Sequence, residues 1–484
     1  MNPAAPNIIW LYCDELRADA LGPYADSAAG PGFSPRTPAI DALAENAVVF
    51  RECFTNSPVC VPARTAILTG QPPERTGVYH NEAYADGFPM PAGLTTFPEV
   101  FAGHGYRTAS FGKHHAPAAL TPWQHTDSTG GGMRDPFSAH DPAELDILTT
   151  PGTGFIVAGT VPEGGRYLPE RVTDHTVDWI AEHADTPFLV RASYLQPHTP
   201  VIVPHEFSAM RDRDDGPGGA PAQEVSSPFE AAFADVSGGQ GLSAAQQRRA
   251  RSAYHNLVSW IDSQVARIVA ALQRAGVADR TVIVLTSDHG AHLGETGAFG
   301  KHTFAPQAHR VPLIIAAPGL APGHREDLAQ SIDLARTLFG LCGIDAPDSF
   351  GGRDLFVDPA PRAIFATIGF GAVWSTAFPN KMYGRYPGGH AWPRRSCVRT
   401  DRFRFDMTTR VDGRAPTPEE EEPFLADRAA DAAERTNLAE HPRYRSMVTR
   451  LRDMVRGNAR GAVEIEDAVL LDLCTAALRL HRPS

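Results

Sequence analysis

The stretch TVIVLTSDHG, residues 281–290, is a short apolar run that ends in an aspartate and a histidine. Valine, isoleucine and leucine without polar alternation are typical of a strand that is buried on both faces of a parallel sheet. Three other runs end in the same way: NIIWLYC leads to Asp14, RTASF to Lys113 and His115, and PFLVRASYL to His198. Helical patterns separate these runs. The sequence therefore predicts an α/β fold with a large mixed, mainly parallel sheet sandwiched by helices.

The polar residues that follow these strands are expected to meet. In an open parallel sheet, ligands bind beyond the carboxyl ends of the strands, so residues from distant parts of the chain converge there. Asp14, Asp288 and His289 are the ligand types that suit a hard or borderline divalent ion. Positive charge and proton donors around an anion would come from Lys113, His115, His198 and Lys301. Each residue alone has an ordinary structural explanation, as a cap, a turn or a solvated side chain; together they favour a site.

A long helix is predicted from Ser243 to Gly276. Ser243 and Gln246 resemble a capping box, Gly276 closes the helix, and an apolar stripe that includes Trp260 and Ile261 belongs to the core. The preceding stretch, residues 211–242, is rich in glycine, proline and aspartate, which predicts a long surface insertion. A passive loop is the simpler interpretation of that insertion, and a lid over the site is the alternative.

Composition limits the kind of partner. The chain has 484 residues, 42% of them hydrophobic, and a formal charge of -12, which argues against nucleic acid or an anionic membrane as the main partner. Its six cysteines are widely spaced without a C-x-x-C pair, which predicts buried thiols in place of disulfides or a zinc site. The first residues, MNPAAPNIIWLYCDE, contain no basic leader and no run long enough for a membrane span. We therefore expect a cytoplasmic protein.

The segment NSPVCVPARTAILTG, residues 56–70, places a cysteine at a predicted helix start. Pro62 is tolerated in the first turn because the backbone donor that it lacks would be unpaired there. Arg64 follows Cys60 by one helical turn. Free backbone donors, the positive helix end and a guanidinium form a natural anion site, in which Cys60 would be well placed as a nucleophile. The alternative is a small buried thiol beside a surface arginine.

Taken in order, these segments resemble the formylglycine-dependent type I sulfatases of the alkaline phosphatase superfamily. CVPAR matches the modification motif C-x-P-x-R, FGKHH the G-K-x-H element, and LQPHTP the P-H-x-P element. SDHGAHLGETGAFGKHTFAPQAHRVPLII matches the second metal segment with its lysine, and CVRTDRFRFD and DAAERTNLAEHPRY resemble a C-terminal hairpin strand and closing segment. The match leaves 211–242 and parts of 125–165 and 375–395 uncovered. It implies a catalytic α/β domain over 1–360 and a smaller C-terminal α+β subdomain, with an antiparallel sheet and helix, over 361–484.

The resemblance also implies a chemistry. A maturation enzyme would oxidise Cys60 to formylglycine, whose hydrate attacks the sulfur of a sulfate ester with help from Arg64. Lys113, His198 and Lys301 would hold the sulfate, His198 or Lys301 would protonate the leaving alcohol, and His115 would act as base on the second hydroxyl. Metal ligands carry over as Asp14, Cys60, Asp288 and His289, and Asn81 matches a substrate-binding asparagine. The ion is expected to be Ca²⁺, with Mn²⁺ as the alternative.

One difference from the usual family motif, at residue 15, indicates which members of the family the sequence resembles most. Many members have two aspartates after the first strand, whereas here Asp14 is followed by Glu15. Choline sulfatase and phosphonate monoester hydrolases also keep a single aspartate there, with glutamine next, so the pattern is nearest to theirs. Whether Glu15 is a metal ligand stays open at this point. Relatives with this pattern are often multimeric, which leaves a homo-oligomer open.

Three functions compete on the sequence. The first is hydrolysis of a small-molecule sulfate ester. The second is hydrolysis of a phosphonate monoester or a phosphodiester at the same site, because a tetrahedral anion, a metal and a hydrated aldehyde serve both. The third is a non-catalytic anion-binding protein in which Cys60 is never oxidised, although a binding protein has no need of both a nucleophile and two histidines. The alcohol part of the substrate would be recognised by loops, with 211–242 and 378–396 as candidates.

Overall fold

The computed structural model describes most of the chain. The described residues are 5–25, 36–84, 87–120, 122–209, 227–369, 371, 386 and 391–464. Half of the predicted insertion, residues 211–226, and most of the candidate segment 378–396 lie outside them. Among the described residues, no helix combines the length and the apolar character needed to cross a bilayer.

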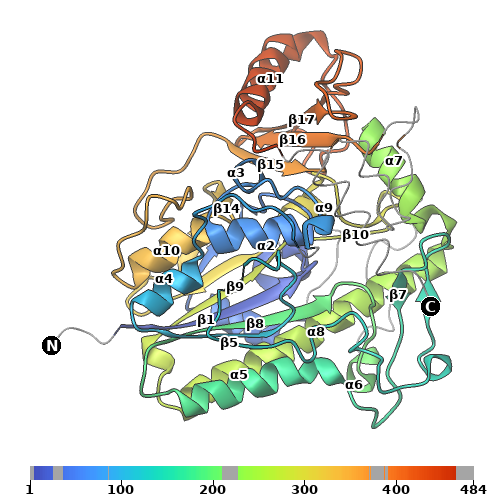
Figure 1. The fold of residues 1–484 in the computed structure, drawn as a ribbon. Helices are drawn as coiled ribbons and strands as arrows, with labels where there is room; N and C mark the ends of the chain where they lie inside the picture. The colour runs from blue at the N-terminus through green and yellow to red at the C-terminus, as the bar shows by residue number, and fades with distance from the viewer. Residues whose placement is uncertain are drawn as a thin grey trace.

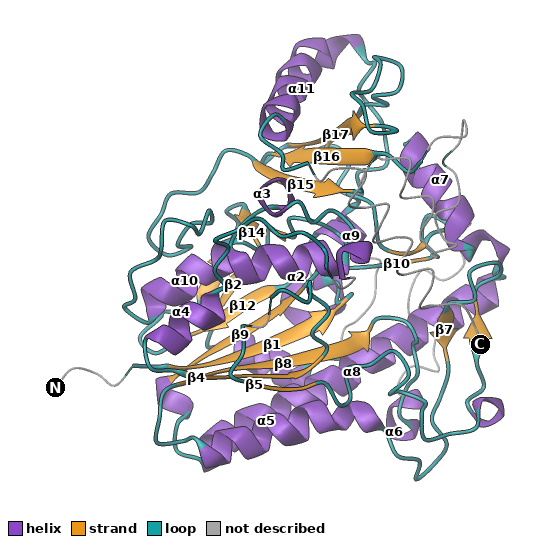
Figure 2. Cartoon of the chain, in the orientation of Figure 1, coloured by secondary structure: helices purple, strands orange, loops and turns teal. Residues whose placement is uncertain are grey.

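The central sheet has eight strands, and most of its neighbouring strands run parallel (Figure 2). Only β12 runs antiparallel to both of its neighbours. In spatial order the strands are β13 (Gly323–Arg325), β2 (Val48–Phe50), β12 (Leu313–Ala316), β9 (Thr281–Ser287), β1 (Asn7–Asp14), β8 (Phe188–Pro197), β4 (Arg107–Gly112) and β5 (His125–Asp127). The four strands predicted from apolar runs are β9, β1, β8 and β4, which lie side by side. The predicted mixed, mainly parallel sheet is confirmed.

Both faces of this sheet are covered by helices, because alternate side chains of its strands enter two separate cores. From β1, Ile9 and Leu11 pack with one core cluster, whereas Ile8 and Trp10 pack with the other. Figure 1 shows the two helical layers above and below the sheet. One layer contains α1 (Pro38–Ala44), α5 (Arg171–Glu182) and α8 (Ala244–Arg274), and the other contains α2 (Cys60–Thr69), α4 (Phe97–Gly103) and α10 (Asp333–Leu341).

Short elements complete the main body. The two-stranded pairs are β3 (Cys53–Phe54) with β14 (Ala329–Gln330), β6 (Leu148–Thr149) with β7 (Ile156–Ala158), and β10 (His292–Leu293) with β11 (Phe299–Gly300). The remaining helices there are α3 (Pro73–Thr76), α6 (His205–Ser208), α7 (Pro228–Ser237) and α9 (Pro306–His309).

Helix α8 confirms the predicted long helix, and α7 corrects the predicted insertion. Ser243 accepts from the backbone of Gln246, whose side chain accepts from Ser243, as in a capping box. Residues 228–237, expected to be part of a surface loop, form α7 with Phe229 and Phe233 buried. Ser227 caps this helix, and Gly238 ends it with a left-handed backbone. The many glycines and prolines on both sides of residues 228–237 predicted a loop, although these ten residues themselves have the apolar face of a helix.

A second, antiparallel sheet lies beyond the main body with one long helix packed on it (Figure 1). Its strands are β15 (Ile364–Ile368), β16 (Arg394–Arg399), β17 (Phe403–Arg410) and β18 (Phe424–Asp427), and the helix is α11 (Arg445–Ala459). This confirms the predicted smaller C-terminal sheet and helix. The division of the chain into domains at about residue 360 stays a prediction.

A buried ionic network joins the second sheet to the main body. Arg399 of β16 has no exposed surface and pairs with Glu434 at 2.8 Å. The same guanidinium donates to the carbonyl of Phe304 at 2.6 Å and to Nδ1 of His309 at 2.9 Å. His309 in turn contacts the carbonyl of Thr55 through Nε2 at 2.9 Å. The segment that follows Lys301 is therefore fixed from the second sheet.

We expect Glu434→Gln to lower the free energy of unfolding by about 3 kcal/mol. The change leaves Arg399 buried without its counter-charge, and an unpaired buried charge is strongly destabilising. Chemical denaturation followed by circular dichroism measures the effect. Glu326→Gln is the matched control, because Glu326 pairs with Arg51 at the surface with a side chain that is 71% exposed. Equal effects of the two substitutions would contradict a structural role for the buried pair.

Candidate active site

Four parallel strands deliver polar residues to one edge of the central sheet, as the sequence predicts. Asp14 is the last residue of β1, Asp288 follows β9, Lys113 follows β4 and His198 follows β8. The register explains the convergence, because Cys13 pairs with Ser287 across β1 and β9 and both strands end together. All four side chains are buried.

Helix α2 brings Cys60 to the same edge. Cys60 is the first residue of the helix and has no exposed surface. Next to it, the backbone N–H of Val61 donates to Oδ1 of Asn81 at 3.0 Å, which satisfies one of the free donors at the helix start. The helix ends at Gly70, whose backbone is left-handed and whose Cβ, if present, would lie 2.4 Å from the ring of Phe350. The predicted helix start and end are both confirmed.

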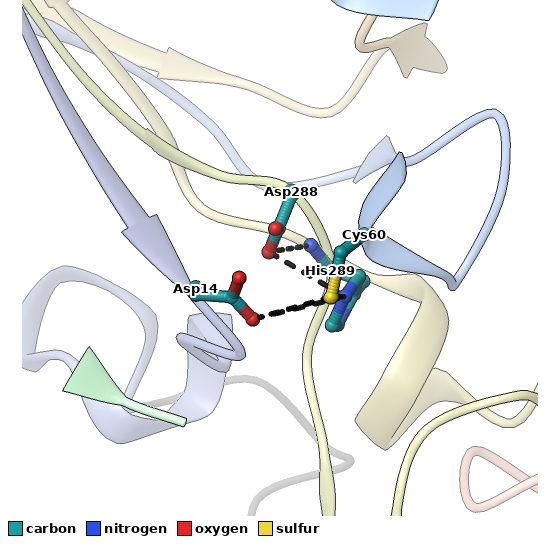
Figure 3. A group of neighbouring side chains, drawn as sticks. All are labelled: Asp14, Cys60, Asp288 and His289. Carbon is teal, nitrogen blue, oxygen red and sulfur yellow. Dashed lines mark hydrogen bonds and ion pairs between the residues drawn. The ribbon is translucent and has the colours of Figure 1, made fainter. Parts of the chain in front are cut away.

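The ligand atoms of four residues form one compact cluster (Figure 3). These atoms all lie within 4.8 Å of one another, in the residues Asp14, Cys60, Asp288 and His289. The sulfur of Cys60 is 3.6 Å from Oδ1 of Asp14 and 3.3 Å from Nε2 of His289. In Figure 3 the carboxylate of Asp14, at the end of β1, points toward this sulfur, and the carboxylate of Asp288, just after β9, contacts His289. We call these four residues the four-residue cluster.

The donor set of the four-residue cluster fits a divalent ion. Carboxylate oxygens suit calcium or manganese, and a neutral imidazole nitrogen is compatible with manganese. Nδ1 of His289 lies 2.9 Å from the carbonyl of Gly290 and donates to it, so Nε2 is the nitrogen that faces the cluster. Such an outer hydrogen bond is the usual way to orient a metal-binding histidine. Burial lowers the pKa of His289, but the charges of Asp288 and Cys60 outweigh it and raise this pKa to about 9, so a bound ion would take the place of the proton on Nε2.

The electrostatics of the carboxylates also fit a bound cation. Burial and the sulfur of Cys60 raise the pKa of Asp14, but the charge of Lys113 and of other cations outweighs them and lowers this pKa overall. Burial, followed by the charge of Asp14, raises the pKa of Asp288. A divalent ion between the two would replace their repulsion by attraction and keep both ionised.

Arg64 forms ion pairs with the carboxylates of Asp14 and Asp288. Its guanidinium is completely buried and donates to Oδ2 of Asp288 at 2.9 Å and to Oδ2 of Asp14 at 3.1 Å. It also donates to the carbonyl of Lys113 and to Oγ of Ser193, both at 3.2 Å. Arg64 therefore locks the two predicted metal-binding aspartates together.

Cationic groups surround the sulfur of Cys60. Nζ of Lys301 lies 2.9 Å from the sulfur, and Nζ of Lys113 lies 2.5 Å from Oδ2 of Asp14. Burial raises the pKa of Cys60, but Lys301, Lys113, His289 and a hydrogen bond from His115 outweigh it and lower this pKa well below that of a free thiol. The surroundings of residue 60 therefore stabilise a negative charge on its side chain.

His115 is in the neutral form that a base requires. Burial and the charge of Lys113 lower its pKa to about 4. The ring lies edge-on to Tyr84, with centroids 5.1 Å apart. A neutral imidazole beside residue 60 can accept a proton at pH 7.

Sequence reasoning missed two polar side chains and left a third unplaced. Oγ of Ser193, in the middle of β8, donates to the carbonyl of Lys113 at 2.6 Å and accepts from Arg64. The hydroxyl of Tyr254, on α8, donates to the carbonyl of Glu15 at 2.6 Å. The carboxylate of Glu15 lies 2.9 Å from Nζ of Lys301 and 3.5 Å from Nε2 of His198. Neither Ser193 nor Tyr254 belongs to a recognisable motif, and only the tertiary register brings them to the site.

A cavity of about 830 Å³, including its open mouth, adjoins the cluster. Glu15, Asn81, His198 and Lys301 line the end beside the four-residue cluster. Much of the remaining lining is apolar: Ala250 of α8, Val157 of β7, Leu293 and Phe299 of the β10–β11 pair, and Met133, Phe155 and Val201 of loops. Such a cavity is suited to the alcohol part of an ester.

Two family models match the chain. The model described as Sulfatase matches residues 6–344, a range that contains all four residues of the cluster. The model described as N-sulphoglucosamine sulphohydrolase, C-terminal, matches residues 294–460.

Curated relatives and solved structures resemble the chain over most of its length. The ulvan-active sulfatase of Formosa agariphila is 25% identical over 478 residues, which cover 93% of this chain and 80% of the relative. The choline-sulfatase of Rhizobium meliloti is 27% identical over 478 residues, which cover 94% of this chain and 87% of the relative. The crystal structure of the phosphonate monoester hydrolase of Agrobacterium radiobacter has the same fold, with a TM-score of 0.75 at 21% identity over 94% of this chain and 96% of that one.

Proposed function

The chain belongs to the sulfatase family and is a sulfuric ester hydrolase, and we propose that it works through a formylglycine made from Cys60 and one divalent metal ion. The observation that carries the proposal is the position of the Cys60 sulfur. It lies at the start of α2, 2.9 Å from Nζ of Lys301 and 3.3 Å from Nε2 of His289, inside the four-residue cluster. A structural thiol has no need of these partners.

The first step of the proposed reaction is attack by residue 60 on sulfur. Hydration of the aldehyde gives two hydroxyls on one carbon, and one of them, as an oxyanion, forms a bond to the sulfur of the ester. The bond between sulfur and the alcohol oxygen breaks, and His198 or Lys301 gives that oxygen a proton. Lys113, His198 and Lys301 hold the sulfate oxygens while charge moves onto the leaving group.

The second step is the release of sulfate from residue 60. His115, which is neutral at pH 7, takes the proton of the remaining hydroxyl. The electron pair re-forms the carbon–oxygen double bond and breaks the bond between that carbon and the sulfate oxygen. Sulfate leaves, and water restores the hydrate. No water molecule has to attack the crowded sulfur.

The proposed metal site uses Asp14, Asp288, His289 and residue 60. A divalent ion there would act as a Lewis acid that lowers the pKa of a hydroxyl of residue 60. Ca²⁺ is our first choice because two of the ligands are carboxylates, and Mn²⁺ is the alternative because one is an imidazole. Arg64 positions the two aspartates, and the amide oxygen of Asn81 fixes the backbone beside residue 60.

The cavity beside Lys301 and His198 would take the alcohol part of a small-molecule sulfate ester. Its apolar wall supports an alcohol with a hydrophobic surface, because the hydroxyl of Tyr254 and Oγ1 of Thr199 are already used in bonds to backbone carbonyls. A maturation enzyme would supply the oxidised residue 60. The cytoplasmic location and the homo-oligomer stay predictions.

We expect an aryl sulfate to be hydrolysed with a larger kcat/KM than a phosphonate monoester or a phosphodiester with the same leaving group. The family supports the sulfate ester, whereas the likeness in fold to a phosphonate monoester hydrolase supports the alternative. Parallel assays with 4-nitrophenyl sulfate, 4-nitrophenyl phenylphosphonate and bis(4-nitrophenyl) phosphate measure the order. A preference of about 100-fold or more for the phosphonate would make sulfate ester hydrolysis the side activity.

A further inference from the structure

His114 lies between two residues of the proposed reaction, Lys113 and His115, in the loop that follows β4. Lys113 is held by its own backbone, since its N–H donates to the carbonyl of Ser193 at 2.8 Å and its carbonyl accepts from Ser193 and Arg64. His115 has a φ of 43°, in the left-handed region, which costs free energy for a residue with a side chain. Such a backbone persists where the surrounding structure holds it. The support for His115 therefore has to come from its neighbours.

The ring of His114 is fixed at both of its nitrogens. Nδ1 lies 3.1 Å from Nη2 of Arg191, and Nε2 lies 3.1 Å from the carbonyl of Leu120. A guanidinium can only donate, so Nδ1 accepts and the proton of the ring is on Nε2, which donates to the carbonyl. Burial and the charge of Arg191 lower the pKa of His114 to about 4. The neutral ring that both bonds require is therefore the form present at pH 7.

Arg191 is a rigid anchor for this ring. It lies in β8, has no exposed surface, and donates from Nε to Oγ of Ser110 on β4 at 2.9 Å. Its guanidinium lies over the rings of Trp10 and Trp123, at 5.4 and 5.0 Å from their centroids. Burial lowers the pKa of Arg191 to about 9, so the guanidinium keeps its charge at pH 7. The bond to His114 is therefore charge-assisted and originates in the central sheet.

We propose that His114 is a positioning residue that holds His115 beside residue 60. This inference rests on the proposed function, in which His115 takes a proton from residue 60 in the second step. The ring of His114 ties the loop to Arg191 in the sheet and to Leu120, six residues farther along the chain. The backbone of His115 therefore starts from a fixed point. A displacement of about 1 Å at a reacting group can cost about 100-fold in rate, so this support affects turnover.

The test separates the two steps of the proposed reaction, because the inference concerns only the second. His114→Phe keeps a ring of similar size but neither bond, so it should slow the release of sulfate and leave the attack on sulfur unchanged. We expect kcat and KM for 4-nitrophenyl sulfate to fall together by about 10- to 100-fold, with kcat/KM unchanged. The first turnover should release 4-nitrophenol in a burst, and mass spectrometry of the peptide that contains residue 60 should find this residue sulfated.

Three other variants calibrate the effect of His114→Phe. His114→Asn places an oxygen near the position of Nδ1 and keeps the bond from Arg191, so it should recover part of the lost kcat. His115→Asn removes the proposed base itself and gives the full size of the effect. His183→Phe is the matched control, because His183 is also half-buried and its Nδ1 lies 3.0 Å from a backbone carbonyl, that of Trp179.

The kinetic pattern distinguishes positioning from a merely structural role. Equal losses in kcat and kcat/KM for His114→Phe, with KM unchanged and residue 60 unsulfated, would overturn the inference, because they would show only a loss of active protein. Kinetics like those of the parent would also overturn it, as would equal changes in His183→Phe. If His114→Phe does not fold, His114→Gln takes its place with the same expected pattern, since it loses the acceptor for Arg191. A His115→Asn variant that does not accumulate sulfated residue 60 would refute the second step of the proposed function instead.

Discussion

Replacing Cys60 by alanine is expected to abolish sulfate ester hydrolysis, with a loss of at least about 10⁴-fold in kcat. The variant has neither the aldehyde hydrate nor any other nucleophile at the start of α2. Lys301, His289 and Asp14 would then surround an empty volume where the attacking oxygen should be. Hydrolysis of 4-nitrophenyl sulfate by the purified variant measures the loss.

The control for this substitution is Cys53→Ala. Cys53 is also a buried thiol, but it lies in β3, away from the four-residue cluster. We expect its removal to leave the rate unchanged. Mass spectrometry of the peptide that contains residue 60, in the parent protein, should show the aldehyde in place of the thiol. An unoxidised thiol, together with equal turnover by parent and Cys60→Ala, would favour the non-catalytic anion-binding protein.

Removal of the divalent ion is expected to reduce kcat by about 10³-fold, since a metal acting as a Lewis acid contributes several kcal/mol to such a reaction. Treatment with a chelator followed by gel filtration should give inactive protein, and added Ca²⁺ or Mn²⁺ should restore the rate. The ion that restores activity at the lower concentration identifies the preferred metal. Elemental analysis should give one ion per chain in the active enzyme.

The variant Asp288→Asn tests whether the four-residue cluster is the site that binds the metal ion. It removes one charged ligand from the four-residue cluster and keeps the size of the side chain, so the metal concentration for half-maximal activity should rise by about 100-fold or more. Asp262→Asn is the control, because this buried aspartate accepts from Ile40 and Ala39 outside the site. Full activity of protein that elemental analysis finds free of metal would refute the proposed role of the ion.

The central sheet and the meeting of its strand ends could be predicted because they depend on local patterns. Apolar runs identify buried parallel strands, and parallel strands must present their carboxyl ends at a common edge. Asp14, Lys113, His198 and Asp288 reach the site for this reason alone. Lys301 follows the β10–β11 pair and not a strand of the central sheet, so its expected place around the anion came from its charge and from the resemblance, not from the strand ends.

Other features could not be predicted because they depend on contacts between distant segments. The sequence shows that Glu15 follows Asp14, but the direction of its side chain follows from a left-handed backbone and from the bond between its carbonyl and Tyr254. The hydrogen bonds from Arg64 to both Asp14 and Asp288 also depend on the tertiary fold and could not be predicted from local sequence. Helix α7 was predicted as part of a loop, because glycine, proline and aspartate are frequent on both sides of its ten residues.

The complete burial of Cys60 has a consequence for the order of events during synthesis. In the finished fold a maturation enzyme could not reach this side chain, which is closed in by β1, β9 and the segment that carries Lys301. The ribosome makes residue 60 roughly 220 residues before it makes β9, an interval of about ten to forty seconds at ordinary elongation rates. The proposed oxidation therefore has to take place before the chain folds around residue 60, and β9 is made late enough to leave time for it.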